Sequence, residues 1–174
     1  MTDRLTKPDL LRLFTLLDEE LATTGTRAEL YLVGGAVMCL ALDARDATRD
    51  VDAWFQPVTA VRQAAARVAE RASVPAGWLN DAVKGFLSAR GDYVAFLERP
   101  HLAVFVAVPE YLLALKCMAM RLGAEFQDEA DVRFLLRLLD LQTADDALDV
   151  VGRYFDPARV PLKTRLALQE LLGG

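Results

Sequence analysis

Apolar and polar positions follow two different periods along residues 1–108, and the change of period separates strands from helices. Apolar residues that recur every three to four positions predict one face of a helix, whereas short apolar or alternating runs predict strands. The helical period covers residues 8–22, 36–42 and 58–72, and the strand pattern covers 29–33, 51–55, 93–97 and 102–108. Strands that alternate with helices predict a sheet with helices packed against it.

From Pro109 onward only the helical period remains, and it predicts helices over 109–122, 128–141, 144–154 and 161–172. Pro109 suits a first helical turn, where its missing N–H is not needed, and Glu110 is favourable near a helix N-terminus. We therefore expect a mixed α/β (α+β) fold in two regions. Residues 1–108 would form a small mixed sheet of four or five strands with packed helices, and residues 109–174 a C-terminal helical bundle.

The composition supports a folded chain and narrows its partners. Of the 174 residues, 53% are hydrophobic and 26% are charged, which is enough apolar material for a sizeable core. Charges interrupt every long apolar stretch and the N-terminus lacks the pattern of a signal peptide, so we expect neither a membrane span nor secretion. The net charge of −5 argues against general nucleic-acid binding, because phosphate neutralisation supplies most of that affinity.

Two cysteines and one histidine offer little metal or redox chemistry. Cys39 and Cys117 lie in apolar surroundings, and His101 begins a predicted strand. These three residues are too few for a structural zinc site, and a disulfide scaffold is equally unexpected. We expect both cysteines to belong to the core and the protein to be cytoplasmic.

A glycine pair, Gly34-Gly35, stands between a predicted strand and a predicted helix. Glycine there lets backbone N–H groups approach an anion, and a helix N-terminus adds a favourable dipole. Taken alone, the pair is equally consistent with a simple tight turn.

Two aspartates, Asp50 and Asp52, alternate with apolar residues at the start of the strand over 51–55. Residues i and i+2 of a strand share one face, so both carboxylates are expected about 7 Å apart at their Cα atoms. Two like charges held together favour a cation between them, and Mg²⁺ prefers carboxylates together with phosphate oxygens. The alternative is a solvated face of an edge strand.

A lysine, Lys116, lies inside the apolar run EYLLALKCMAM, where it must either extend to the surface or meet an anion. Arg121 follows shortly after it, and Asp128 and Asp131 come next at a spacing of three residues. Residues at i and i+3 share one helix face, so these two carboxylates are expected side by side. Asp128 also suits the N-cap of its helix.

In this order the motifs resemble those of a known superfamily. LVGGAV and TRDVDAWF resemble the glycine motif and the Asp-x-Asp strand of the polymerase-β-like nucleotidyltransferases. LLALKCMAMR and QDEADV are similar to the lysine, arginine and Asp-x-x-Asp motif of AbiEii-type nucleotidyltransferases. These are the toxin halves of bacterial toxin–antitoxin systems and include MenA-like proteins. WLNDAVKGFL is similar to a string in uncharacterised bacterial members of that group, and the resemblance covers about residues 29–140.

The resemblance implies a reaction in which an RNA or protein hydroxyl attacks the α-phosphate of an NTP and pyrophosphate leaves, with metal ions stabilising both oxygens. The nucleotide-binding residues it implies are Gly34, Gly35, Lys116 and Arg121. The Mg²⁺ ligands it implies are Asp50, Asp52 and Asp131, and the catalytic residues are Asp50, Asp52, Lys116 and Asp131. Its implied partners are an NTP, an RNA such as tRNA, and a cognate antitoxin protein.

This sequence departs from the family pattern in two places. Fourteen residues separate Gly35 from Asp50, which predicts an extended loop over DARDATR. Many members carry a third carboxylate on a later strand, but the strand over 102–108 contains no acid, and Asp131 or Asp128 would have to substitute. The alternative function is a non-catalytic interaction module of the same fold, such as an antitoxin or a nucleotide sensor. A plain structural α/β protein is the third interpretation.

Overall fold

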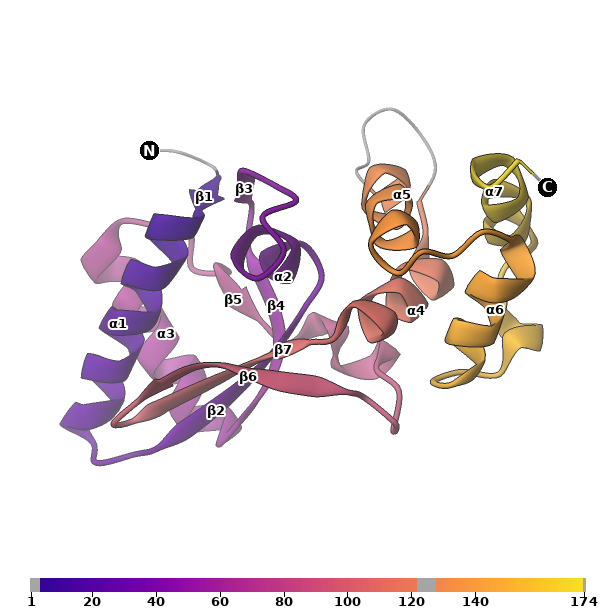
Figure 1. Cartoon of the computed structure of the whole chain (residues 1–174). Coiled ribbons are helices and arrows are strands. Elements are labelled where there is room, and N and C mark those ends of the chain that lie inside the picture. Colours follow the sequence, from indigo (N-terminus) through magenta and orange to yellow (C-terminus); the bar gives the residue numbers. More distant parts are fainter. Residues whose placement is uncertain (1–3, 122–127, 174) are drawn as a thin grey trace. The chain divides into compact units, whose positions relative to one another are not determined.

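The computed structural model describes residues 4–121 and 128–173 (Figure 1). The chain divides into two compact units. Unit 1 comprises Met1–Gly85 and Tyr93–Ala107, and unit 2 comprises Phe86–Asp92 and Val108–Gly174. Unit 1 contains the sheet and unit 2 contains the C-terminal helices, which confirms the predicted mixed α/β fold class.

Unit 1 is built on a five-stranded mixed sheet with the strand order β5-β4-β2-β7-β6. The strands are β2 (Ala28–Val33), β4 (Val51–Gln56), β5 (Leu79–Asn80), β6 (Tyr93–Arg99) and β7 (Leu102–Ala107). The central strand β2 pairs antiparallel with β4 and parallel with β7. The strand β6 pairs antiparallel with β7, and β5 pairs parallel with β4.

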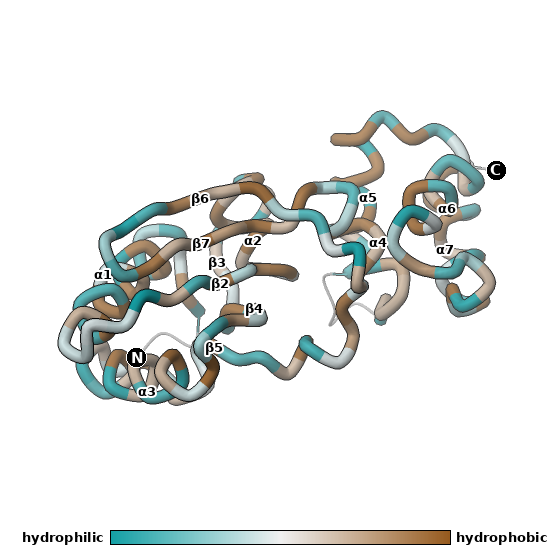
Figure 2. The backbone as a smooth tube through the Cα atoms, turned by 90° about the horizontal axis from the view of Figure 1, so that it is seen from below, coloured by the Kyte–Doolittle hydropathy of each residue, from teal (hydrophilic) through white to brown (hydrophobic). Residues whose placement is uncertain are grey.

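Helices cover one face of this sheet. They are α1 (Lys7–Thr23), α2 (Gly35–Leu40) and α3 (Val58–Ala72), and α1 packs along α3 (Figure 1). Alternate strand residues such as Leu30, Ala53 and Val104 are fully buried beneath them. The tube of β7 is hydrophobic along its length in Figure 2, in keeping with its place between β2 and β6 in the sheet.

The opposite face of the sheet carries a row of aromatic rings, which we call the aromatic row. Tyr31 on β2 is stacked between Trp54 on β4 and Phe105 on β7, with ring centroids 4.0 and 4.8 Å apart and interplanar angles of 3° and 9°. Tyr93 on β6 meets Tyr31 edge-on at 5.2 Å. All four side chains are half-buried, so the row is partly open to solvent.

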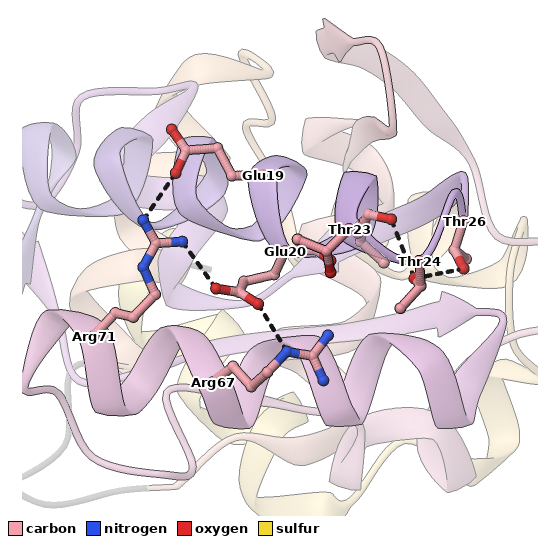
Figure 3. A network of polar contacts seen from close by, with 8 residues as sticks. Glu19, Glu20, Thr23, Thr24, Thr26, Arg67 and Arg71 are labelled. Carbon is pink, nitrogen blue, oxygen red and sulfur yellow. Dashed lines mark hydrogen bonds and ion pairs between the residues drawn. The ribbon is translucent and has the colours of Figure 1, made fainter.

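An ion-pair network joins α1 to α3 (Figure 3). Glu20 on α1 accepts hydrogen bonds from Arg67 Nε at 2.7 Å and from Arg71 Nη1 at 2.9 Å, and Arg71 also bonds Glu19. The Glu20 side chain is 11% exposed, whereas that of Glu19 is 51% exposed. Arg67 and Arg71 of α3 therefore serve the packing of this helix against α1.

A two-stranded ribbon holds the loop that precedes β4. The strand β1 (Leu5–Thr6) pairs antiparallel with β3 (Ala47–Thr48). At the start of α1, Thr6 and Asp9 form a capping box, in which the Thr6 hydroxyl accepts from the Asp9 N–H. The segment DARDATR is therefore an ordered part of unit 1 with one end in a strand pair.

Unit 2 consists of α4 (Pro109–Ala119), α5 (Asp128–Leu138), α6 (Ala144–Gly152) and α7 (Leu162–Leu171), with a short 3-10 helix over Pro157–Arg159. Helix α4 packs against both α5 and α6, and α6 packs against α7. Residues 86–92 join this unit because Ser88 N–H donates to Tyr111 Oη at 3.0 Å and Ser88 Oγ donates to the Tyr154 carbonyl at 2.5 Å.

Most predicted elements are present, and the differences lie at their ends. Helix α3 has the predicted bounds, whereas α4 ends at Ala119 before the predicted end near Leu122, a residue outside the described ones. Helix α5 ends at Leu138 because Asp140 adopts a left-handed φ of 53°. Among the helices of residues 4–121 and 128–173, none has the length and apolarity to cross a bilayer.

Candidate functional site

The glycine turn, Gly34-Gly35, lies against the carboxylate of Asp52. Strand β2 ends at Val33, which faces Asp52 across the β2–β4 ladder. Gly34 follows with φ 69° and ψ −149°, a conformation that side-chain-bearing residues rarely adopt. A Cβ atom at Gly34 would lie 3.4 Å from Asp52 Oδ2. The positive φ therefore turns the backbone so that a bare glycine faces this carboxylate.

Asp50 and Asp52, which we call the carboxylate pair, lie on the same side of the sheet. Asp52 and Asn80 are register partners in the parallel β4–β5 pair, so their side chains share one face. Asn80 Nδ2 donates to Asp50 Oδ2 at 3.4 Å, which places the Asp50 carboxylate on that face as well. Asp50 precedes β4 instead of lying in it as expected, because the β2–β4 pairing already ends at Asp52.

The environment of Asp50 disfavours its negative charge. Burial raises the pKa of the Asp50 carboxyl, and the Asn80 hydrogen bond and the nearby Arg49 charge offset that rise only in part. A half-buried carboxylate whose ionisation is penalised gains from a cation placed beside it. The Asp50 carboxylate thus has the electrostatic character expected of a cation ligand.

A guanidinium group occupies the space that a side chain at Gly35 would fill. A Cβ atom at Gly35 would lie 2.6 Å from Arg45 Nη1 and 3.0 Å from Thr48 Oγ1. The sequence did not point to Arg45 or Thr48 as site residues. The long spacing between Gly35 and Asp50 was the available signal, because it shows that a loop must return to the glycine turn.

A second group of predicted residues, the lysine cluster, joins α4 to α5 in unit 2. Lys116 Nζ lies 2.9 Å from both Asp128 Oδ1 and Asp131 Oδ2. The other Asp128 oxygen accepts from the backbone N–H of Arg121 at 3.0 Å and from its Nε at 2.9 Å. Of the two alternatives expected for Lys116, extension to the surface or contact with an anion, the structure shows the second. Both anions come from α5.

Charge pairing dominates the electrostatics of the lysine cluster. The side chains of Lys116, Asp128 and Asp131 are 15%, 5% and 4% exposed, whereas that of Arg121 is 61% exposed. Burial pushes the pKa of Asp128 upward, but hydrogen bonds from Arg121 and Lys116 outweigh it and lower the pKa to about 2. The Asp128 carboxylate thus keeps its charge near neutral pH.

The predicted site residues form two clusters, one in each unit. Unit 1 brings together Gly34, Gly35, Asp50 and Asp52, and unit 2 brings together Lys116, Arg121, Asp128 and Asp131. Two cavities of about 440 and 340 Å³ lie elsewhere, and no predicted site residue lines either.

The donor set of unit 1 fits Mg²⁺ as a partial site. Within residues 4–121 and 128–173, no group of three Asp, Glu, His or Cys side chains could hold a metal ion. The carboxylate pair supplies two hard oxygen ligands, and Mg²⁺ in such sites takes its remaining ligands from water and substrate phosphates. On β7, Ala107 lies level with Val33 and Asp52 across the neighbouring strands and on the same face of the sheet. A third carboxylate from β7 would have to project from this position.

The other conspicuous residues have structural roles. Cys39 and Cys117 are buried as expected, and burial raises the pKa of Cys117 to about 12. Trp78 is fully buried and its Nε1 donates to the Ala65 carbonyl at 3.0 Å. The His101 backbone N–H donates to Asp18 Oδ1 at 2.8 Å, which ties α1 to the β6–β7 turn.

Comparison with known proteins gives no independent assignment. No protein-family model, no curated protein and no solved structure matches this chain.

Proposed function

We propose that this protein is a metal-dependent nucleotidyltransferase that transfers a nucleotidyl group from an NTP to a hydroxyl of RNA or protein. The observation that carries the proposal is the contact of Asp52 with the Gly34 turn, with Asp50 on the same side of the sheet. A glycine turn gives phosphate oxygens access to the backbone, and a carboxylate pair beside it binds the accompanying cation. The order of these motifs also underlies the resemblance to AbiEii-type enzymes.

In this proposal each group of unit 1 has a defined task. Asp50 and Asp52 would hold Mg²⁺, which when bound neutralises phosphate charge and activates the α-phosphate for attack. Gly34 brings no side chain of its own to the space beside Asp52, which favours approach of the triphosphate to the pair. The acceptor hydroxyl attacks the α-phosphorus, a new P–O bond forms, and the bond to pyrophosphate breaks.

The aromatic row is the surface on which we place the nucleobase. Trp54 lies two residues beyond Asp52 on the same strand face, about 7 Å along β4. Strand β5 pairs with Val51 and Asp52, and among the residues that the structure describes no strand pairs with Trp54 on that edge. A base stacked on the indole would continue a series of rings that already lie nearly parallel.

In unit 2, the residues that the resemblance assigns to such a reaction are those of the lysine cluster. Arg121 is its exposed cation and suits contact with phosphate or base, and Lys116 and Asp131 are the catalytic residues that the resemblance implies. An NTP, an RNA such as tRNA and a cognate antitoxin protein are the partners that fit a toxin-type enzyme of this kind. Such a protein would work in the cytoplasm.

One observation favours a second candidate, a non-catalytic nucleotide-binding module such as an antitoxin or a sensor. Strand β7 has no acidic residue on the face that carries the carboxylate pair. A site with two carboxylates binds Mg²⁺ chiefly together with a triphosphate. Nucleotide binding without transfer would therefore identify this second function.

The test is transfer of radioactive label from each of the four α-labelled NTPs to total RNA or to lysate protein, with Mg²⁺ or with EDTA. We expect Mg²⁺-dependent labelling that Asp50→Asn combined with Asp52→Asn abolishes. Asp46→Asn is the matched control, because Asp46 is an exposed carboxylate in the preceding loop. Equal labelling by the wild type and the double variant would remove the carboxylate pair from the site.

A further inference from the structure

Arg45 is held in place at both ends of its short loop segment. On one side, the Ala44 N–H donates to the Met38 carbonyl of α2 at 2.8 Å. On the other side, Ala47 and Thr48 pair with Thr6 and Leu5 in the β1–β3 ribbon. The Thr48 side chain is buried, and its hydroxyl donates to the Asp50 carbonyl at 3.1 Å. The backbone that carries Arg45 is thus tied to α2, to β1 and to the carboxylate pair.

The guanidinium of Arg45 reaches the glycine turn only because residue 35 has no side chain. Its Nη1 lies 2.6 Å from the position of a Cβ at Gly35, a separation that real Cβ contacts do not show. Asp52 Oδ2 lies 3.4 Å from the corresponding position at Gly34. A cation and a carboxylate therefore flank the two glycines of one turn.

We propose that Arg45 is a phosphate-binding residue that grips the triphosphate of the NTP at the glycine turn. This inference rests on the proposed function, because it assigns a further residue of that same site. A triphosphate carries more negative charge than one Mg²⁺ neutralises, and the carboxylate pair adds to the excess. A guanidinium supplies a permanent positive charge and a planar set of N–H donors that matches phosphate oxygens.

Gly35 and Arg45 work as one unit in this arrangement. A methyl group at position 35 would occupy the place of Nη1, and the guanidinium, as the far end of a flexible side chain, would move away. The atoms near that methyl group belong to the side chains of Arg45 and Thr48 and none to the backbone, so side-chain shifts accommodate the change. Gly35→Ala should therefore reproduce the loss of binding caused by Arg45→Ala, and combining the two changes should add little.

The test measures binding of inorganic tripolyphosphate, of NTP and of the corresponding nucleoside by calorimetry in Mg²⁺. We expect Arg45→Ala to weaken tripolyphosphate and NTP binding on the order of 10- to 100-fold, as for loss of a charge-assisted hydrogen bond. Nucleoside binding should not change, and Arg45→Lys should restore part of the affinity. A merely structural role would not distinguish the phosphate chain from the nucleoside.

Two control variants match the changes in type and leave the site intact. Arg12→Ala removes an exposed arginine of α1, and Gly77→Ala adds a methyl group where nothing lies within 4 Å. Both should bind tripolyphosphate like the wild type. Thermal unfolding of every variant confirms that it is folded before its affinity is compared.

The outcomes separate this inference from the proposed function. Unchanged tripolyphosphate binding by Arg45→Ala, or additive losses in the Gly35→Ala and Arg45→Ala double variant, would overturn the role of Arg45 even if label transfer occurs. Tripolyphosphate binding that depends on Arg45, without transfer from any NTP, would support Arg45 and reject catalysis. A wild type that binds neither tripolyphosphate nor NTP would overturn both.

Discussion

Asp52 Oδ2 lies 3.4 Å from the position that a Cβ atom would occupy at Gly34, and Gly34 adopts φ 69°. The strand pairing explains this contact, because Val33 faces Asp52 and the chain must leave β2 at the next residue. The left-handed φ turns the backbone away without a side chain pressing on the carboxylate. Position 34 therefore requires glycine for two reasons, its positive φ and the closeness of the Asp52 carboxylate, and a simple tight turn would need only the first.

Gly34→Ala should therefore harm binding as well as stability. We expect a loss of about 1–3 kcal/mol in unfolding free energy from backbone strain, with NTP binding reduced at least tenfold because the turn shifts against Asp52. Gly25→Ala is the matched control, since Gly25 has φ 62° and nothing within 4 Å of its Cβ position. Urea unfolding and NTP calorimetry of both variants provide the comparison. Equal NTP affinity in the two variants would show that only strain matters.

Asp50→Asn should raise the melting temperature at pH 7 while it abolishes label transfer. Burial raises the folded-state pKa of Asp50, so its stabilising contribution is complete below the unfolded pKa and is lost as pH rises through the folded one. The variant has no carboxyl to ionise at position 50, so it does not lose this contribution to stability. Its melting temperature should therefore exceed that of the wild type by an amount that grows from pH 3 to pH 7. Scanning calorimetry across this range measures it, with Asp46→Asn as the exposed control. A lower melting temperature for Asp50→Asn would contradict the assigned environment.

Local pattern was sufficient to predict several elements of the fold. Helix α3 was predictable because Val61, Ala65 and Val68 recur on one buried face, and β4 because apolar residues alternate with aspartates. For Lys116 the sequence left two alternatives, extension to the surface or contact with an anion. Asp128 and Asp131 supply the anion, because their spacing places them on one helix face.

The position of Arg45 could not be predicted from pattern. It depends on the path of a polar loop, and that path is set by the pairing of two residues of β1 with two residues of β3. Strands this short carry no periodic signal, because two residues cannot show an alternation. The end of α5 is a similar case, since nothing in the local sequence demands the left-handed φ of Asp140.

Asp128→Asn should destabilise the protein in a pH-dependent way. The pKa of Asp128 is lowered to about 2, so its contribution is present above the unfolded pKa and is lost as pH falls toward 2. We expect a loss of about 1–2 kcal/mol at pH 6, after allowance for the exposure of Arg121, that shrinks between pH 4 and pH 2. Urea unfolding at each pH measures it. Glu129→Gln is the control, because the Glu129–Arg133 ion pair is exposed and its N–O distance is 3.6 Å. If Glu129→Gln lost as much stability as Asp128→Asn, burial of the Asp128–Lys116 pair would not explain the loss.

Glu20→Gln should cost more stability than Glu19→Gln, although both carboxylates bond Arg71. Glu20 is nearly buried and accepts from two arginines, and the hydrogen bonds from Arg67 and Arg71 lower its pKa. We expect a loss of about 1–2 kcal/mol for Glu20→Gln and less than about 0.5 kcal/mol for Glu19→Gln. Chemical unfolding in low and high salt gives both values. Similar costs for the two variants would mean that the α1–α3 contact does not depend on the buried acid.

Ala107→Asp should give the sheet a third carboxylate and make Mg²⁺ binding independent of nucleotide. Ala107 on β7 stands in the same row as Val33 and Asp52, and Phe105, two residues before it, stacks on Tyr31, which confirms the shared face. Because Ala107 is buried, an unpaired aspartate there costs stability, and a bound cation recovers it.

The variant should therefore melt below the wild type in EDTA and gain several degrees in millimolar Mg²⁺ without any nucleotide. Ala107→Asn has the same shape without the charge, so it should show the loss but not the Mg²⁺-dependent gain. Replacing Mg²⁺ by Ca²⁺ tests whether the rise in melting temperature depends on coordination geometry or on charge alone. Mg²⁺ is the smaller ion and demands a tighter octahedral set of ligands. If the Asp and Asn variants gain equally from Mg²⁺, a carboxylate at position 107 does not bind the cation together with Asp50 and Asp52. The proposed Mg²⁺ site at the carboxylate pair would then be wrong.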